Sequence, residues 1–140
     1  MKVLFDTNVI MDVLLDRQPH AVTAVALLAA VEQDRVDGYL CANSVTTIDY
    51  LITKTLSRVA AGVAVRNLLS LFAVAEVNRT TLLVALDLGF GDFEDAVLYQ
   101  SGLAAGVDAV VTRNGRDFKQ ANLPIYSPGE LYGLLLPPGY

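Results

Sequence analysis

Acidic residues placed at predicted strand ends and helix starts are the most chemically informative feature of this 140-residue chain. Asp6 directly follows the apolar run Lys2–Phe5, and a later acid follows the apolar strand at residues 107–111. The residues in question are Asp6, Asp92, Glu94, Asp95 and Asp117. Parallel α/β sheets bind ligands beyond the carboxyl ends of their strands. We therefore expect acids from distant parts of the sequence to lie together at one edge of a sheet.

Carboxylates gathered in this way repel one another. At about 5 Å and an effective dielectric near 20, each ionised pair costs on the order of 3 kcal/mol. A fold keeps such a cluster mainly to bind a cation, and hard oxygen ligands favour Mg²⁺ or Mn²⁺. The acidic pattern alone therefore predicts metal-assisted phosphodiester chemistry.

The elements that must position these acids alternate along the chain. Strands are predicted at residues 2–5, 38–41, 73–77, 107–111 and 124–126. Helices are predicted at residues 7–15, 19–35, 58–72, 79–88 and 93–105, with one more capped by Asn43 or Ser44 and running to Leu56, and a last one after Ser127. This alternation predicts an α/β domain over residues 1–140, with a parallel sheet covered on both faces and a C-terminal helix and tail from about residue 127.

The composition excludes some classes of protein. Hydrophobic residues make up 54% of the chain and charged residues 18%, so little disorder is expected. No run is long and apolar enough for a membrane span or a signal peptide, and the single cysteine, Cys41, fits a reducing cytoplasm. The net charge of −5 argues moderately against broad nucleic-acid affinity, although the acidic cluster supplies part of it.

Each acid also has a plain structural explanation. Asp6 can cap the following helix, Asp117 can be a turn residue, and Asp92 and Asp95 have capping-box spacing in a first helical turn. Their combination across the predicted sheet edge is more informative than any one of them. Asp12, the only polar residue between Val9 and Leu15, needs a partner if it is buried. It either bonds a nearby backbone group or Arg17 or supports the site, and we expect support.

Asp49 is ambiguous on position alone. It borders the apolar stripe formed by Val45, Ile48, Ile52 and Leu56 on a predicted helix. Such a residue is either solvated at the edge of the stripe or aimed across the sheet edge toward Asp6. His20 has no second histidine or cysteine at ligand spacing, so it is expected to be a surface or capping residue.

The segments around these acids resemble the PIN-domain ribonuclease family, particularly its VapC-like toxin branch. The matching segments are FDTNVIMD at residues 5–12, TTIDY at 46–50, DFEDA at 92–96 and VTRN at 111–114, followed by Asp117 and Phe118. Order and spacing match over nearly the whole domain. The resemblance implies a three-layer α/β/α sandwich with a central parallel sheet, and a Mg²⁺ or Mn²⁺ site built from Asp6, Asp95 and Asp117.

The resemblance also implies the roles of other residues. The family's fourth acid is usually glutamate and here corresponds to Asp49, which is shorter, so Asp92 could act as an additional ligand. The expected catalytic residues are then Asp6, Asp49, Asp95 and Asp117. Residues that orient the phosphate or the ligands are expected to be Asn8, Asp12, Thr112 and Asn114. Apart from the resemblance, basic residues lie together in the sequence, so Lys54, Arg58, Arg113 and Arg116 are either RNA contacts or scattered solvated charge. RNA as substrate, a homodimer and a cognate antitoxin are further implications of the resemblance.

These residues predict in-line hydrolysis by a metal-activated water, which leaves a 5′-phosphate and a 3′-hydroxyl. A haloacid-dehalogenase phosphatase would need a second aspartate where Asn8 stands, and a receiver domain would need an acidic pair that is not evident. The rival hypothesis is a non-catalytic protein-interaction module with the same fold. The aspartate at position 49 and the very apolar segment at residues 21–31 suit that rival.

Overall fold

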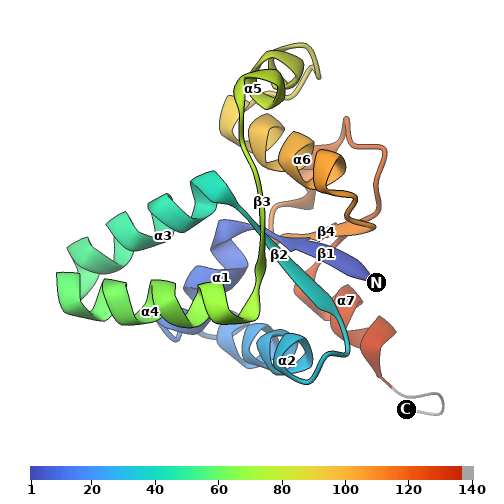
Figure 1. The fold of residues 1–140 in the computed structure, drawn as a ribbon. Helices are drawn as coiled ribbons and strands as arrows, with labels where there is room; N and C mark the ends of the chain where they lie inside the picture. The colour runs from blue at the N-terminus through green and yellow to red at the C-terminus, as the bar shows by residue number, and fades with distance from the viewer. Residues whose placement is uncertain (137–140) are drawn as a thin grey trace.

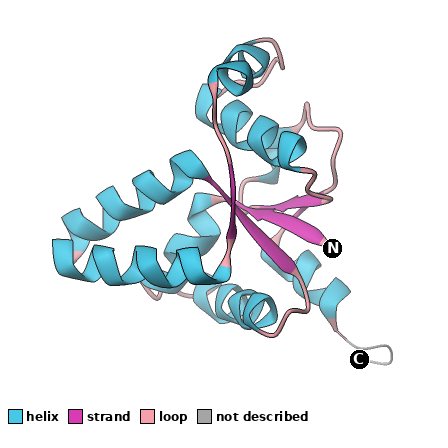
Figure 2. Cartoon of the chain, in the orientation of Figure 1, coloured by secondary structure: helices cyan, strands magenta, loops and turns pink. Residues whose placement is uncertain are grey.

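The computed structural model describes residues 1–136, and the last residues of the predicted tail lie outside them. Helices and strands alternate along most of the described chain, as predicted (Figure 2). The strands are β1 (Lys2–Phe5), β2 (Asp37–Cys41), β3 (Ala73–Ala75), β4 (Ala109–Val111) and β5 (Ile125–Tyr126). The helices are α1 (Thr7–Leu14), α2 (His20–Glu32), α3 (Ala42–Thr55), α4 (Arg58–Leu71), α5 (Arg79–Leu86), α6 (Phe93–Ala105) and α7 (Pro128–Leu135), with a 3-10 turn, η1, at Gly115–Phe118.

All five strands form one parallel sheet in the order β3-β2-β1-β4-β5. The chain leaves β1 toward β2 and β3, and then returns to the other side of β1 to form β4. The β1–β4 pair is therefore the point where the strand order reverses, and ligands bind beyond the carboxyl ends of strands at such a point. The register pairs Phe5 with Val111, so the residues after these two strands, Asp6 and Thr112, emerge side by side.

Side-chain alternation along β1 divides the core between the two faces of the sheet. Val3 and Phe5 are buried on the face covered by α1, α2 and α7, whereas Leu4 is buried on the face covered by α6, on which α5 packs. These layers lie on opposite sides of the sheet, and α3 and α4 form a hairpin that projects from its edge (Figure 1). The predicted three-layer α/β/α sandwich with a parallel sheet is confirmed.

Local sequence signals explain most element boundaries. Asp92 caps α6 by accepting from the backbone N–H of Asp95 at 3.1 Å, and Gly106 ends the helix with a left-handed φ of +84°. Asn78 caps α5, and Ser127 with Glu130 forms the predicted capping box of α7. The predicted cap of α3 was wrong, because the helix begins at Ala42, directly after β2, and its N-cap residue Cys41 makes no side-chain cap. Ser44, one of the two predicted caps, instead accepts a bond from the hydroxyl of Thr7 at 3.0 Å.

The apolar helix α2 is only partly covered within the chain. Its buried residues include Ala24 and Leu27, whereas Val22 and Val25 are exposed. Val22 and Val25 are therefore apolar side chains left on the outer face of the helix. No helix in residues 1–136 is long and apolar enough to cross a membrane.

Gly102 tests how tightly α6 packs on β1. A Cβ at this position would stand 2.7 Å from Leu4 Cδ2 and 3.1 Å from Val107 Cγ2, both in the buried core. We expect Gly102→Ala to lower the free energy of unfolding by about 1–3 kcal/mol because the core must shift.

Gly62, on the exposed side of α4, is the matched control, because a Cβ built there would have no atom within 4 Å. Gly62→Ala should therefore raise the free energy of unfolding by about 0.5–1 kcal/mol. Urea unfolding of both variants checks the pair, and a stabilised Gly102→Ala would contradict the packing.

Candidate active site

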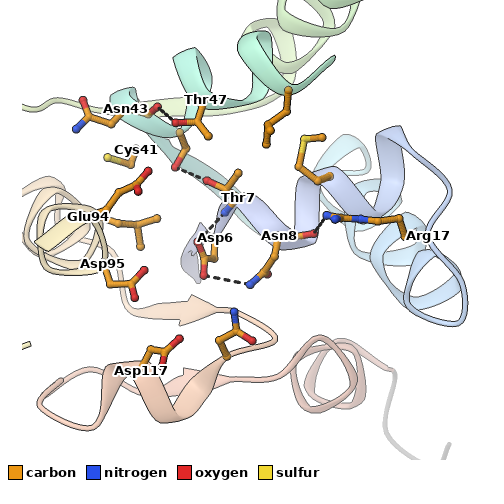
Figure 3. Close-up of a pocket in the computed structure, with 15 residues that line it drawn as sticks. Asp6, Thr7, Asn8, Arg17, Cys41, Asn43, Thr47, Glu94, Asp95 and Asp117 are labelled. Carbon is orange, nitrogen blue, oxygen red and sulfur yellow. Dashed lines mark hydrogen bonds between the residues drawn. The ribbon is translucent and has the colours of Figure 1, made fainter. Parts of the chain in front are cut away.

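A pocket of about 330 Å³ opens at the carboxyl ends of β1 and β4. Carboxylates from three separate segments face it: Asp6 after β1, Glu94 and Asp95 in the first turn of α6, and Asp117 in η1 (Figure 3). Asn8 and Asn114 also line it. The structure thus brings together four of the five acids expected at the sheet edge, including Glu94, which the sequence analysis left without a role as a ligand.

Asp6 is the most rigidly held of the acids, and it is only 8% exposed. Asp6 caps α1, as its plain structural explanation predicted, because Oδ1 accepts a hydrogen bond from the backbone N–H of Thr7 at 2.7 Å. The hydroxyl of Thr112 donates to Oδ2 at 2.8 Å, and Asn8 Nδ2 lies 3.4 Å from the same oxygen. The carboxylate that caps α1 is therefore also one that faces the pocket, and Thr112 and Asn8 contact its other oxygen.

The loop after β4 positions Asp117 through its backbone. The N–H of Asn114 donates to the hydroxyl of Thr112 at 3.0 Å, and the N–H of Asp117 donates to the carbonyl of Asn114 at 2.9 Å. The next residue, Phe118, is buried and packs edge-to-face on Phe90 with ring centroids 5.8 Å apart. This anchor fixes η1, and with it the side of the pocket that carries Asp117.

Burial and mutual repulsion raise the pKa values of two of the acids. The pKa of Asp95 rises to about 7, first because the carboxyl is partly buried and then because Asp6, Asp92, Asp117 and Glu94 carry like charge. Burial also raises the pKa of Asp6, although the bonds from Thr112 and Thr7 oppose the shift. The acids of the pocket thus repel one another, and the positive groups around them do not fully offset this repulsion.

The donor chemistry of the pocket fits a hard divalent cation. Mg²⁺ and Mn²⁺ prefer carboxylate oxygens, and excess negative charge is what such an ion neutralises. Within residues 1–136, no three Asp, Glu, His or Cys side chains have the spacing of an assembled metal site, so the carboxylates would have to turn toward a shared ion. Asp6, Asp95, Asp117 and Glu94 are the residues that could hold it.

Asp49 lies outside this pocket, which corrects its predicted position as the fourth acid. Its two oxygens accept from Arg58 Nη1 at 2.9 and 2.8 Å, in the hairpin between α3 and α4. The face of α3 that lines the pocket carries Ser44, Thr47 and Leu51. Asp49 follows Thr47 by two residues, or about 200° around the helix, and so faces α4 instead.

Two further predicted roles also change. Asp92 does not line the pocket but caps α6, and it lines a neighbouring cavity of about 400 Å³ together with Asp95 and Asp117. Arg58 is engaged by Asp49, and neither it nor Lys54 lines a described cavity beside the acids.

Asp12 is a completely buried residue of α1, and two arginines pair with it. Arg17 Nε lies 3.0 Å from one oxygen and Arg113 Nε lies 2.6 Å from the other. The sequence allowed either a partner such as Arg17 or support of the site. The structure shows the ion pair between Asp12 and Arg17, and Arg17 itself lines the carboxylate pocket.

Arg116, another candidate RNA contact, lines the neighbouring cavity with Asp92.

Comparison with protein families identifies the chain. The model of the PIN domain matches residues 2–116, which is most of the chain, and the protein belongs to the PIN-domain family. No curated protein sequence matches it significantly.

Solved structures show the same fold at low sequence identity. One is VapBC2 from Rickettsia felis bound to a DNA fragment from their promoter, with a TM-score of 0.70 and 13% identity over 91% of this chain and 98% of the other. FitAcB from Neisseria gonorrhoeae has a TM-score of 0.69 and 21% identity over 91% and 98%. DNA-bound VapBC from Salmonella typhimurium has a TM-score of 0.68 and 16% identity over the same shares.

Glu94 is the site residue that sequence reasoning named but left without a role. The family resemblance selected its neighbour Asp95 as a ligand, whereas acids in a first helical turn are ordinary and the residues alone do not separate Glu94 from Asp95. In the structure both point into the pocket (Figure 3). The one signal in the sequence that could have indicated Glu94 is its position directly beside Asp95 at the start of α6. Asp6 and Asp117, in contrast, have no adjacent acid.

The raised pKa of Asp95 predicts how stability depends on pH. The folded, metal-free protein holds a proton on Asp95 up to about pH 7, whereas the unfolded chain releases it near the ordinary pKa of 3.8. This contribution is present in full below the unfolded pKa and is lost as pH rises through about 7. Between about pH 5 and pH 8 in EDTA, the free energy of unfolding of wild type should fall by on the order of 1 kcal/mol more than that of Asp95→Asn. This value includes an allowance for solvent screening.

Urea unfolding at several pH values measures this difference. Asp6 shifts in the same direction, so a smaller slope should remain in Asp95→Asn. Parallel pH profiles for the two proteins would contradict the raised pKa of Asp95.

Proposed function

We propose that this protein is a divalent-metal-dependent endoribonuclease and the toxin of a toxin–antitoxin pair. The observation that carries the proposal is the convergence of Asp6, Glu94, Asp95 and Asp117 on one pocket at the reversal point of the sheet. Membership of the PIN-domain family, which the sequence resemblance associates with ribonucleases, supports the same chemistry. A bound Mg²⁺ or Mn²⁺ ion would activate a water and neutralise phosphate charge there.

The chain's own groups would prepare the site for this ion. Thr112 and the N–H of Thr7 hold Asp6 in one orientation, so little rearrangement is needed at that ligand. Asp95, with a pKa of about 7, releases its proton easily when a cation approaches at neutral pH. Asn8 and Asn114 present amide groups to the pocket, where they can orient a phosphate oxygen.

The proposed partners follow from the comparisons and the surface. The solved structures with this fold are VapBC and FitAB complexes, which supports a cognate antitoxin for this chain. Exposed apolar side chains on α2 and α4, including Val22, Val25, Val59 and Val63, support a further contact between two copies in a homodimer. We place the protein in the cytoplasm, where its RNA substrate would be found.

A non-catalytic interaction module remains the second candidate. The observation that favours it is the engagement of Asp49 by Arg58, which leaves α3 without a carboxylate in the pocket. Glu94 weakens this alternative because it restores a fourth acid from another helix.

Cleavage of a mixed structured RNA pool separates the two candidates. With Mg²⁺ or Mn²⁺ the purified protein should cut RNA and leave 5′-phosphate ends, and EDTA should stop it. Asp6→Asn and Asp95→Asn should each lower the rate by at least about 100-fold, the scale of losing one preorganised electrostatic group. Asparagine still caps a helix, so Asp6→Asn should remain folded.

Asp49→Asn is the matched control, because it removes a carboxylate charge outside the pocket. It should cut RNA at the wild-type rate and lose no more than about 1 kcal/mol of stability with the exposed Arg58 pair. Cutting that survives in Asp6→Asn and Asp95→Asn would refute the carboxylate site. A product with 2′,3′-cyclic phosphate ends would refute attack by water, since it requires the ribose hydroxyl as nucleophile.

A further inference from the structure

Asp12 pairs with two arginines where one would neutralise it. Both of its oxygens are used, because Arg17 Nε lies 3.0 Å from Oδ1, and Arg113 donates to Oδ2 at 2.6 Å and to Oδ1 at 3.2 Å. One negative and two positive charges leave this Arg17–Asp12–Arg113 cluster with a net charge of +1. A buried carboxylate needs pairing, but the second arginine exceeds that need.

The two guanidinium groups reach different cavities. Arg17 lines the carboxylate pocket, where its Nη2 approaches the carbonyl of Asn8 at 3.4 Å, on the side opposite Glu94 and Asp95 (Figure 3). Arg113 lines a second cavity of about 300 Å³ with His20 and Ser127. Its backbone N–H also donates to Asn8 Oδ1 at 3.3 Å. The cluster therefore connects the acidic pocket to the second cavity.

Both arginines keep donors available to a ligand. Their side chains are 42% and 27% exposed, and within residues 1–136 neither uses all five guanidinium N–H groups on protein acceptors. Asp12 fixes the orientation of each planar group, so a phosphate could bind without much further loss of side-chain entropy.

The charges around the second cavity favour a polyanion. Its lining includes Arg113 and His20 and contains no acidic residue. The first turn of α2, which begins at this cavity, also lacks an acid. The cavity on the other side of the carboxylates has Arg116 and Lys119 but three acids, Asp92, Asp95 and Asp117. In a chain of net charge −5, a nucleic-acid strand should follow the less acidic side.

We propose that Arg17 and Arg113 form a phosphate-binding bridge along which a single RNA strand runs from the carboxylate pocket to the second cavity. This inference rests on the proposed ribonuclease function and adds the path of its substrate. The two arginines contact backbone phosphates. Asp12 is a positioning residue that holds both guanidinium groups and does not touch the strand.

Steady-state cleavage of a fluorescein-labelled single-stranded RNA oligonucleotide at several salt concentrations tests the bridge. Arg17→Met and Arg113→Met should each raise KM about 5- to 10-fold with kcat little changed. Each should also make the slope of log(kcat/KM) against log salt shallower by about 0.7, the loss of one phosphate contact. Each variant leaves Asp12 with one arginine, and thermal melting verifies that it is folded. Arg113→Lys, which keeps the charge, should restore most of the salt slope.

Arg58→Met is the matched control, because it removes an arginine that is also paired to an aspartate but lies away from the pocket. Its KM and salt slope should equal those of wild type. Equal changes in Arg58→Met and the two bridge variants would overturn the proposal, as would an effect confined to Arg116→Met in the other cavity. A wild-type protein that neither binds nor cuts this RNA or the mixed RNA pool would overturn the ribonuclease function together with the bridge.

Discussion

The repulsion between carboxylates that the backbone brings together is the constraint on which the rest of this structure depends. The register of β1 with β4 places Asp6 beside Thr112, and the starts of α6 and η1 deliver Asp95 and Asp117 to the same pocket. Burial, and then the like charge of the neighbouring acids, raises the pKa of Asp95 to about 7. The strands that impose this proximity are completely buried at Phe5 and Val111, so the core holds the acids together against their repulsion.

Much of the fold and part of the site could be predicted from the sequence because their signals are local. The apolar run before Asp6 and the Asp92 and Gly106 caps mark the elements that carry the acids. Parallel strands place Asp6 and the loop that carries Asp117 at one edge, and α6, which leads back to β4, begins near that edge with Asp95. The family resemblance then selected Asp6, Asp95 and Asp117 as the metal ligands. The same rule does not specify which side chain of a helical turn faces the pocket.

The parts that could not be predicted depend on helix phase and on distant contacts. Asp49 borders an apolar stripe, and only the packing of α3 against α4 decides that it faces Arg58. Arg113 is 101 residues from Asp12, so no local pattern indicates that it joins Arg17 at the same carboxylate. Glu94 was hidden because an acid in a first helical turn is already explained by the helix dipole. Each of these is a question of tertiary geometry.

Divalent-metal binding tests the central claim most directly, because it reports on the carboxylates without requiring the correct RNA. We would titrate Mn²⁺ by calorimetry into wild type, Asp6→Asn and Asp49→Asn at neutral pH. The pocket geometry predicts saturable binding to wild type and Asp49→Asn, with proton release, and binding that is lost or greatly weakened in Asp6→Asn. Equal binding to all three proteins, or none to wild type, would show that these carboxylates do not form a cation site.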